Sequence, residues 1–218
     1  MIISLEGVDG IGKTSICNNL SNLSEAPAKM SLISKRDYYG TSKFKSDAAS
    51  QLSHILWEMG DTEDLSTEFW LHLQMTWYHL ISSEIKTYKE SPNIYLLDGW
   101  YYKFLARLAM SDSWKTHFQF CFDNLPEPDY VFLLECNIEN VFARKSFSLT
   151  EMGLHDFGQE VLSKHSFCEY QNKTFRYLKK IHDQSDNWKM INLDGLDLQS
   201  SSEKVNVEVF KCLRDLCG

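Results

Sequence analysis

Residues 4–16 read SLEGVDGIGKTSI and overlap an apolar run at residues 2–5. The stretch holds Gly7, four further residues, and then the triplet Gly-Lys-Thr. Glycines let the backbone curl so that successive N–H groups point inward, an arrangement that binds phosphate oxygens. A helix that begins near Lys13 adds its positive amino-terminal end. The position between a buried strand and a helix predicts a phosphate-binding loop.

The loop residues are the expected contacts of a nucleoside triphosphate and its magnesium ion. Lys13 would reach the transferred phosphoryl group, and the Thr14 hydroxyl would be a magnesium ligand. GTPases, motor ATPases and small-molecule kinases all use such loops, but the chain has no NKxD guanine motif, and the acidic Asp9 favours the kinases. The expected ATP contacts are Gly7, Asp9, Gly10, Ile11, Gly12, Lys13, Thr14 and Ser15.

The rest of the chain alternates short apolar strands with helical patterns. Strands are expected at 2–5, 29–36, 93–98, 129–135 and 188–194. Helices are expected after the loop, between Asp64 and Glu90, and at 202–216, with the serines at 200–202 in a loop. Strands separated by helices need crossover connections. The pattern therefore predicts an α/β fold with a mainly parallel sheet of about five strands flanked by helices.

The long predicted helix between Asp64 and Glu90 carries many apolar residues. One side of it is expected to present Phe69, Leu73, Trp77, Leu80 and Ile81.

Composition and charge narrow the function classes. The 218 residues are 43% hydrophobic and 24% charged, which suits one globular domain. A net charge of -8 argues against nucleic acid as a partner. The six cysteines lack metal spacing, and neither a signal peptide nor a membrane-spanning run is evident, so we expect reduced thiols, a cytoplasmic location and no membrane partner.

Four stretches resemble the thymidylate kinase family of nucleoside monophosphate kinases, over nearly the full length. They are EGVDGIGKTS at 6–15, KRDYYGT at 35–41, LLDGWYYKFLA at 96–106 and PDYVFLLECNIENVFARK at 128–145. The resemblance implies a P-loop nucleotide kinase fold, a single domain over 1–218 with a short lid at about 144–156, and ATP and magnesium as cofactors. It also implies a small-molecule nucleotide substrate and a possible homodimer.

The resemblance implies a role for each residue that matches the family's motifs. Asp9 would hydrogen-bond a sugar hydroxyl of the acceptor, and Arg36 would lie near the acceptor phosphate. Asp37 would lie near the transferring group, Asp98 would face magnesium, and Arg144 would lie against the nucleotide donor. The expected catalytic residues are thus Lys13, Asp37, Asp98 and Arg144, and the expected metal ligands are Thr14 and Asp98.

The acceptor site departs from the family's pattern at two arginines that normally clasp the monophosphate. Gly99 stands at the first position, directly after Asp98, and Trp77 or Tyr78 stands at the second. Lys103 and Arg107 are four residues apart on a predicted helix and share a face, so they are candidate replacements. The alternative interpretation makes both of them solvated surface residues.

Tyr78 and Trp100 are expected beside the acceptor, where their rings would form a stacking surface for a base. Core packing is the alternative, because aromatic residues at helical spacing usually fill cores.

The sequence therefore predicts ATP-dependent phosphoryl transfer to a nucleoside monophosphate, either dTMP or a related or modified pyrimidine deoxynucleotide. Two alternatives stay open. The absent arginines also fit a kinase for a nucleoside or another small hydroxyl acceptor. A nucleotide-binding protein without transfer activity would bind ATP and turn over no acceptor.

Overall fold

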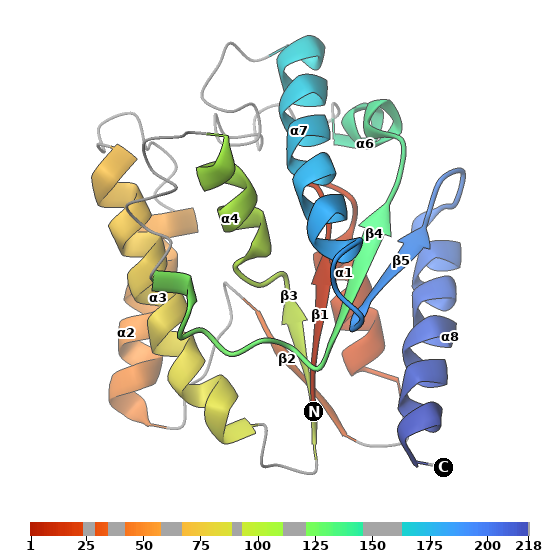
Figure 1. The fold of residues 1–218 in the computed structure, drawn as a ribbon. Coiled ribbons are helices and arrows are strands. Elements are labelled where there is room, and N and C mark those ends of the chain that lie inside the picture. The colour runs from red at the N-terminus through yellow and green to blue at the C-terminus, as the bar shows by residue number, and fades with distance from the viewer. Residues whose placement is uncertain are drawn as a thin grey trace.

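A five-stranded parallel sheet forms the centre of the computed structural model, which describes residues 1–23, 29–34, 42–57, 67–88, 93–110, 121–145 and 163–217. The strand order is β2-β3-β1-β4-β5 (Figure 1). The strands are β1 (Ile2–Glu6), β2 (Met30–Ile33), β3 (Ile94–Asp98), β4 (Tyr130–Glu135) and β5 (Trp188–Asn192). All five predicted strands are confirmed, with ends shifted by a few residues.

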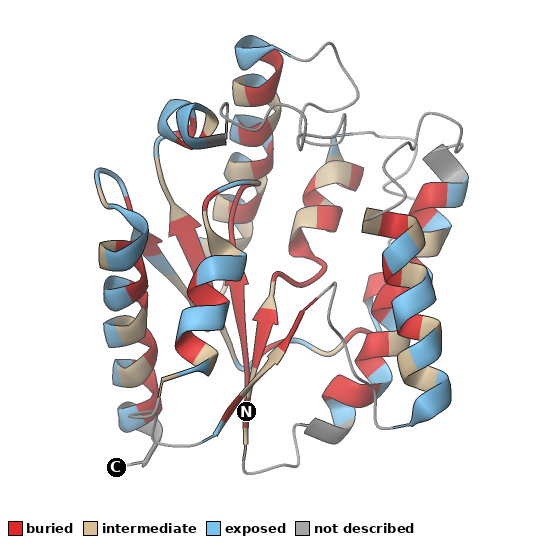
Figure 2. Ribbon diagram, turned by 180° about the vertical axis from the view of Figure 1, so that it is seen from behind, coloured by how far each residue is buried: buried red, intermediate tan, exposed pale blue. Residues whose placement is uncertain are grey.

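Helices cover both faces of the sheet. They are α1 (Lys13–Ser21), α2 (Lys43–Trp57), α3 (Thr67–Tyr88), α4 (Tyr102–Ala109), α6 (Ile138–Lys145), α7 (Lys164–His182) and α8 (Leu198–Cys217). Figure 2 shows the buried residues along the strands and on the inner sides of these helices. None of the helices in the described ranges is long and apolar enough to cross a membrane.

Successive strand residues enter two separate cores, because side chains alternate across a sheet. Ile2, Leu97 and Val131 pack with α2, α3 and α4. Ile3 and Phe132 pack on the opposite face with α1, α6 and α8. Helix α7 supplies buried residues to both cores.

Three sequence-based predictions differ from the structure. Helix α2 was not predicted, because its buried positions include Ala49 and Ser53 and give little apolar contrast. The serines at 200–202 were predicted as a loop but lie in α8, where Ser202 is buried and accepts a hydrogen bond from Asn19 Nδ2 at 3.0 Å. Small side chains let α8 approach α1 closely.

The predicted inner side of α3 is also offset. Phe69 is 50% exposed, whereas Trp70, Gln74 and Trp77 are buried. The helix contacts α2 through the Trp57 and Trp77 rings and α4 through the Trp70 and Phe104 rings, so its buried surface is broader than one apolar stripe.

Candidate nucleotide-binding site

The loop between β1 and α1 lies at the edge of the sheet where the parallel strands end. Gly12 has a φ of 102° and directly precedes α1, a conformation that favours glycine. A Cβ on Gly7 would lie 3.0 Å from the carbonyl oxygen of Leu134 in β4, so a side chain at this position would crowd the β4 backbone. Sequence and packing therefore agree on a tight loop that opens into a helix.

Lys13 closes this loop with its ammonium group. Its Nζ donates hydrogen bonds to the carbonyl oxygens of Gly7 at 2.9 Å and Val8 at 2.8 Å. An ammonium has three donors, so a third can serve a phosphate oxygen. Burial and the nearby Lys103 together lower the pKa of Lys13 to about 8, although carboxylates such as Asp9 act in the opposite direction.

Thr14 and Asp98, the predicted metal ligands, lie together. The Thr14 Oγ1 donates a hydrogen bond to Asp98 Oδ2 at 2.6 Å. This pairing follows from the sheet, since β3 lies beside β1 with Asp98 opposite Leu5. Two adjacent protein oxygens suit Mg²⁺, which takes its remaining ligands from water and phosphate.

Asp9, in the middle of the loop, is the centre of a polar cluster. Its carboxylate accepts hydrogen bonds from Lys103 Nζ, from Arg107 Nη2 at 3.3 Å and from Gln171 Nε2 at 3.2 Å. Lys103 and Arg107 do share a face of α4, as their spacing predicts, and their side chains are only 15% and 16% exposed. Burial alone would raise the pKa of Asp9, but the cations around it hold that pKa well below its usual range.

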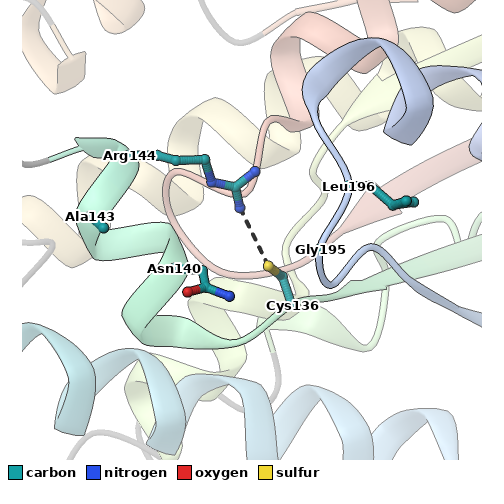
Figure 3. Close-up of a pocket in the computed structure, with 6 residues that line it drawn as sticks. All are labelled: Cys136, Asn140, Ala143, Arg144, Gly195 and Leu196. Carbon is teal, nitrogen blue, oxygen red and sulfur yellow. Dashed lines mark hydrogen bonds between the residues drawn. The ribbon is translucent and has the colours of Figure 1, made fainter.

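An open cavity of about 310 Å³ lies next to the same loop (Figure 3). Its wall joins the end of β4, helix α6 and the turn after β5, and Arg144 Nη2 donates a hydrogen bond across it to Cys136 Sγ at 3.4 Å. Asp194 holds two of these segments together by accepting from the Asn137 backbone N–H and from Asn140 Nδ2. The lining residues are Cys136, Asn140, Ala143, Arg144, Gly195 and Leu196.

Gly99 makes a turn that a buried carboxylate holds. Its φ is 74°, in the left-handed region, and the next N–H, that of Trp100, donates to Glu6 Oε1 at 2.6 Å. Glu6 is 1% exposed and also accepts from Ser4 Oγ at 2.8 Å. The turn explains in physical terms why a glycine stands at this position.

Tyr78 and Trp100 pack in the core beneath the site. Their ring centroids are 5.4 Å apart at an interplanar angle of 89°, and they are 2% and 1% exposed. Trp100 Nε1 also donates to the Pro126 carbonyl oxygen at 3.0 Å. In this structure neither ring offers an accessible face to a base.

Comparison with solved structures decides the fold. A thymidylate kinase from Candida albicans superposes with a TM-score of 0.67 over 98% of this chain and 91% of its own, at 16% sequence identity. The chain has a P-loop NTPase fold. A deoxyadenosine kinase from M. mycoides, solved with the products dCMP and a flexible dCDP, gives a TM-score of 0.62 over 97% of this chain and 100% of its own, at 14% identity. No protein-family model and no curated protein matches the sequence.

Only some of the site residues predicted from the sequence lie in the described part of the structure, and the structure adds two that were not predicted. The positions of Arg36 and Asp37 lie outside the described residues, as does the predicted lid from residue 146 onward. Gln171 was missed because nothing local marks a glutamine on a helix 162 residues from its partner Asp9. Glu6 belongs to the matched stretch 6–15, but only the structure shows that it accepts a hydrogen bond from the Trp100 N–H in the turn after β3.

Proposed function

We propose that the chain is an ATP- and magnesium-dependent kinase that phosphorylates a nucleoside monophosphate, with a pyrimidine deoxynucleotide such as dTMP as the expected class. One observation carries the proposal. Lys13, Thr14 and Asp98 lie together at the P-loop, and the cations Lys103 and Arg107 bind Asp9 of the same loop. A phosphoryl-transfer site needs groups that bind the donor and groups that bind the acceptor close to each other.

The donor half follows from the loop and the open cavity. Backbone N–H groups, the positive end of α1 and the Lys13 ammonium would hold the triphosphate. Thr14 and Asp98 would hold magnesium, which when bound offsets charge on the phosphate oxygens. The cavity beside Arg144 has the size of a small-ligand site, and a planar guanidinium can stack on a base.

The acceptor half rests on α4. Lys103 and Arg107 would supply the positive charge that the family's two arginines supply elsewhere, and Asp9 holds both cations in their positions. A monophosphate dianion would take over hydrogen bonds that these cations now give to the Asp9 carboxylate. Charge-assisted bonds of this kind are about twice as strong as neutral ones.

A nucleoside acceptor is the second candidate. Lys103 and Arg107 are already engaged with Asp9, so a neutral acceptor would leave the cluster intact. The similarity to a deoxyadenosine kinase fold is compatible with this reading.

The test is an assay of ADP release from ATP and Mg²⁺ with a panel of nucleoside monophosphates, base-modified pyrimidine monophosphates and the matching nucleosides. A rate with monophosphates, lost in Lys13→Ala, supports the proposal. A rate with nucleosides alone favours the second candidate. Bound ATP with no turnover on any acceptor would indicate a binding protein and contradict the proposed transfer.

A further inference from the structure

Gln171 on α7 directs both ends of its amide at one residue of the P-loop. Its Oε1 accepts a hydrogen bond from the Asp9 backbone N–H at 3.1 Å, and its Nε2 donates to Asp9 Oδ2 at 3.2 Å. The side chain is fully buried, at 0% exposure. Gln171 therefore holds the backbone and the carboxylate of Asp9 together.

We propose that Gln171 is a positioning residue that fixes the middle of the P-loop and the direction of the Asp9 carboxylate, so that the loop is held ready for a triphosphate. This inference rests on the proposed function, because it assigns the loop a nucleotide.

The loop needs such a restraint because of its glycines. Gly10 and Gly12 adopt φ values of 83° and 102°, and glycine has more backbone freedom to lose than any other residue. Asp9 lies directly before this flexible pair, so a bond to its N–H restrains the loop where the chain itself is least restrained.

Helix α7 is a firm anchor for the restraint. It begins with a capping box between Ser163 and Ser166, and it places Phe167 in one core and Leu178 in the other. A side chain that projects from this helix is thereby fixed relative to both faces of the sheet.

The chemistry of the contact requires an amide. Lys103 and Arg107 also hold the Asp9 carboxylate, but their side chains are donors only and cannot accept the Asp9 N–H. A carboxylate at position 171 could accept the N–H, yet it would face the Asp9 carboxylate without a proton to donate. An apolar side chain would leave the N–H without this acceptor.

The experiment compares Gln171→Leu and Gln171→Glu with the wild type by two measurements. Hydrogen exchange followed by NMR without nucleotide reports the Asp9 amide, and calorimetry reports the affinity for Mg·ATP. In Gln171→Leu we expect exchange at Asp9 to quicken about tenfold or more while β1 amides stay protected, and the affinity to fall by about tenfold or more. In Gln171→Glu the new carboxylate can still accept the Asp9 N–H, so there we expect the affinity to fall because two carboxylates face each other, with little change in Asp9 exchange. Thr174→Val is the matched control, because Thr174 is buried on α7 and, among the described residues, its hydroxyl donates only to the Tyr170 carbonyl of its own helix. It should change neither quantity.

The outcomes separate the two proposals. A wild-type chain that binds no nucleotide contradicts the proposed function, whatever Gln171 does. A wild-type chain that binds Mg·ATP no better than a folded Gln171→Leu variant contradicts the positioning role, as does an unchanged Asp9 exchange rate in that variant. Gln171→Glu keeps the size and shape of the side chain and carries the affinity test if the leucine variant does not fold, and an affinity equal to that of the wild type would then contradict the positioning role.

Discussion

At the scale of single residues, the proposed role of Lys13 predicts a pH dependence of nucleotide binding. Phosphate binds the protonated amine, whose pKa in the free protein lies at about 8. We expect the affinity for Mg·ATP to be highest below pH 8 and to fall as the pH rises above it, by at most about tenfold per pH unit. Calorimetry at pH 7, 8 and 9 measures this decline.

Lys13→Arg is the matched variant for this prediction. A guanidinium stays charged throughout this range, so whatever affinity the variant retains should not fall between pH 7 and 9. A wild-type affinity that stays flat over the same range would contradict a titrating Lys13.

Gly99 allows a second test at this scale. Introducing an arginine through Gly99→Arg should lower the free energy of unfolding by about 1–2 kcal/mol, because a side chain at a φ of 74° enters the left-handed region. Urea unfolding measures the loss, and Gly99→Ala should show a similar one. If Gly99→Arg instead matched the wild type in stability and lowered the KM for a monophosphate, the turn would tolerate the clasp after all.

At the scale of helices and strands, an element could be predicted from the sequence where its buried face is clearly more apolar than its exposed face. The strands were predictable because runs such as YVFLLE are apolar up to the terminal Glu135. Helix α2 was not, since alanine and serine fill part of its buried face. The error at Ser200–Ser202 has the same origin, because close helix packing selects small residues that sequence patterns associate with loops.

The packing of α8 on α1 gives a prediction about Ser202. Ser202→Leu should destabilise the fold by about 1–3 kcal/mol, since extra methylenes would enter a closely packed contact and the bond from Asn19 would be lost. Glu203→Leu, at an exposed neighbouring position, should stay within about 0.5 kcal/mol of the wild type. Thermal or urea unfolding of the pair checks the difference, and equal stabilities would mean that α8 can move away from α1 at little cost.

At the scale of the whole molecule, a bound nucleotide should stabilise the fold. At a concentration 100 times its Kd, Mg·ATP should add about 2.7 kcal/mol. For a chain of this size that corresponds to a rise in Tm of roughly 5–11 °C. Differential scanning calorimetry or fluorimetry measures the rise.

On the proposed function, Thr14 and Asp98 would hold the metal ion that contributes part of this shift. Chelating Mg²⁺ with EDTA should reduce the rise in Tm for the wild type, whereas Asp98→Asn should show a small rise that EDTA hardly changes. If the nucleotide raised the Tm of the wild type equally with and without Mg²⁺, this would contradict a role of Thr14 and Asp98 as metal ligands.

The parts of the candidate site formed by residues close together in the sequence were predictable, and the parts formed by contacts between distant segments were not. The loop, the terminal carboxylate of β3 and the shared face of Lys103 and Arg107 all follow from short spacings. The joining of those two cations to Asp9 depends on how α4 packs against the loop, and the clamp by Gln171 depends on a helix from the last third of the chain. A single sequence carries no signal for such distant contacts.

The bond between Asp9 and Gln171 also bears on how the chain is made. The two residues are 162 positions apart, so at about 5–20 residues per second the loop leaves the ribosome roughly 8–30 s before the glutamine that restrains it. Strand β1 is likewise synthesised before β3 and β4, the two strands that pair with it in the sheet. On the proposed function, a nascent chain would therefore carry the phosphate motif before its phosphate site is complete, and nucleotide affinity would distinguish full-length molecules from interrupted ones.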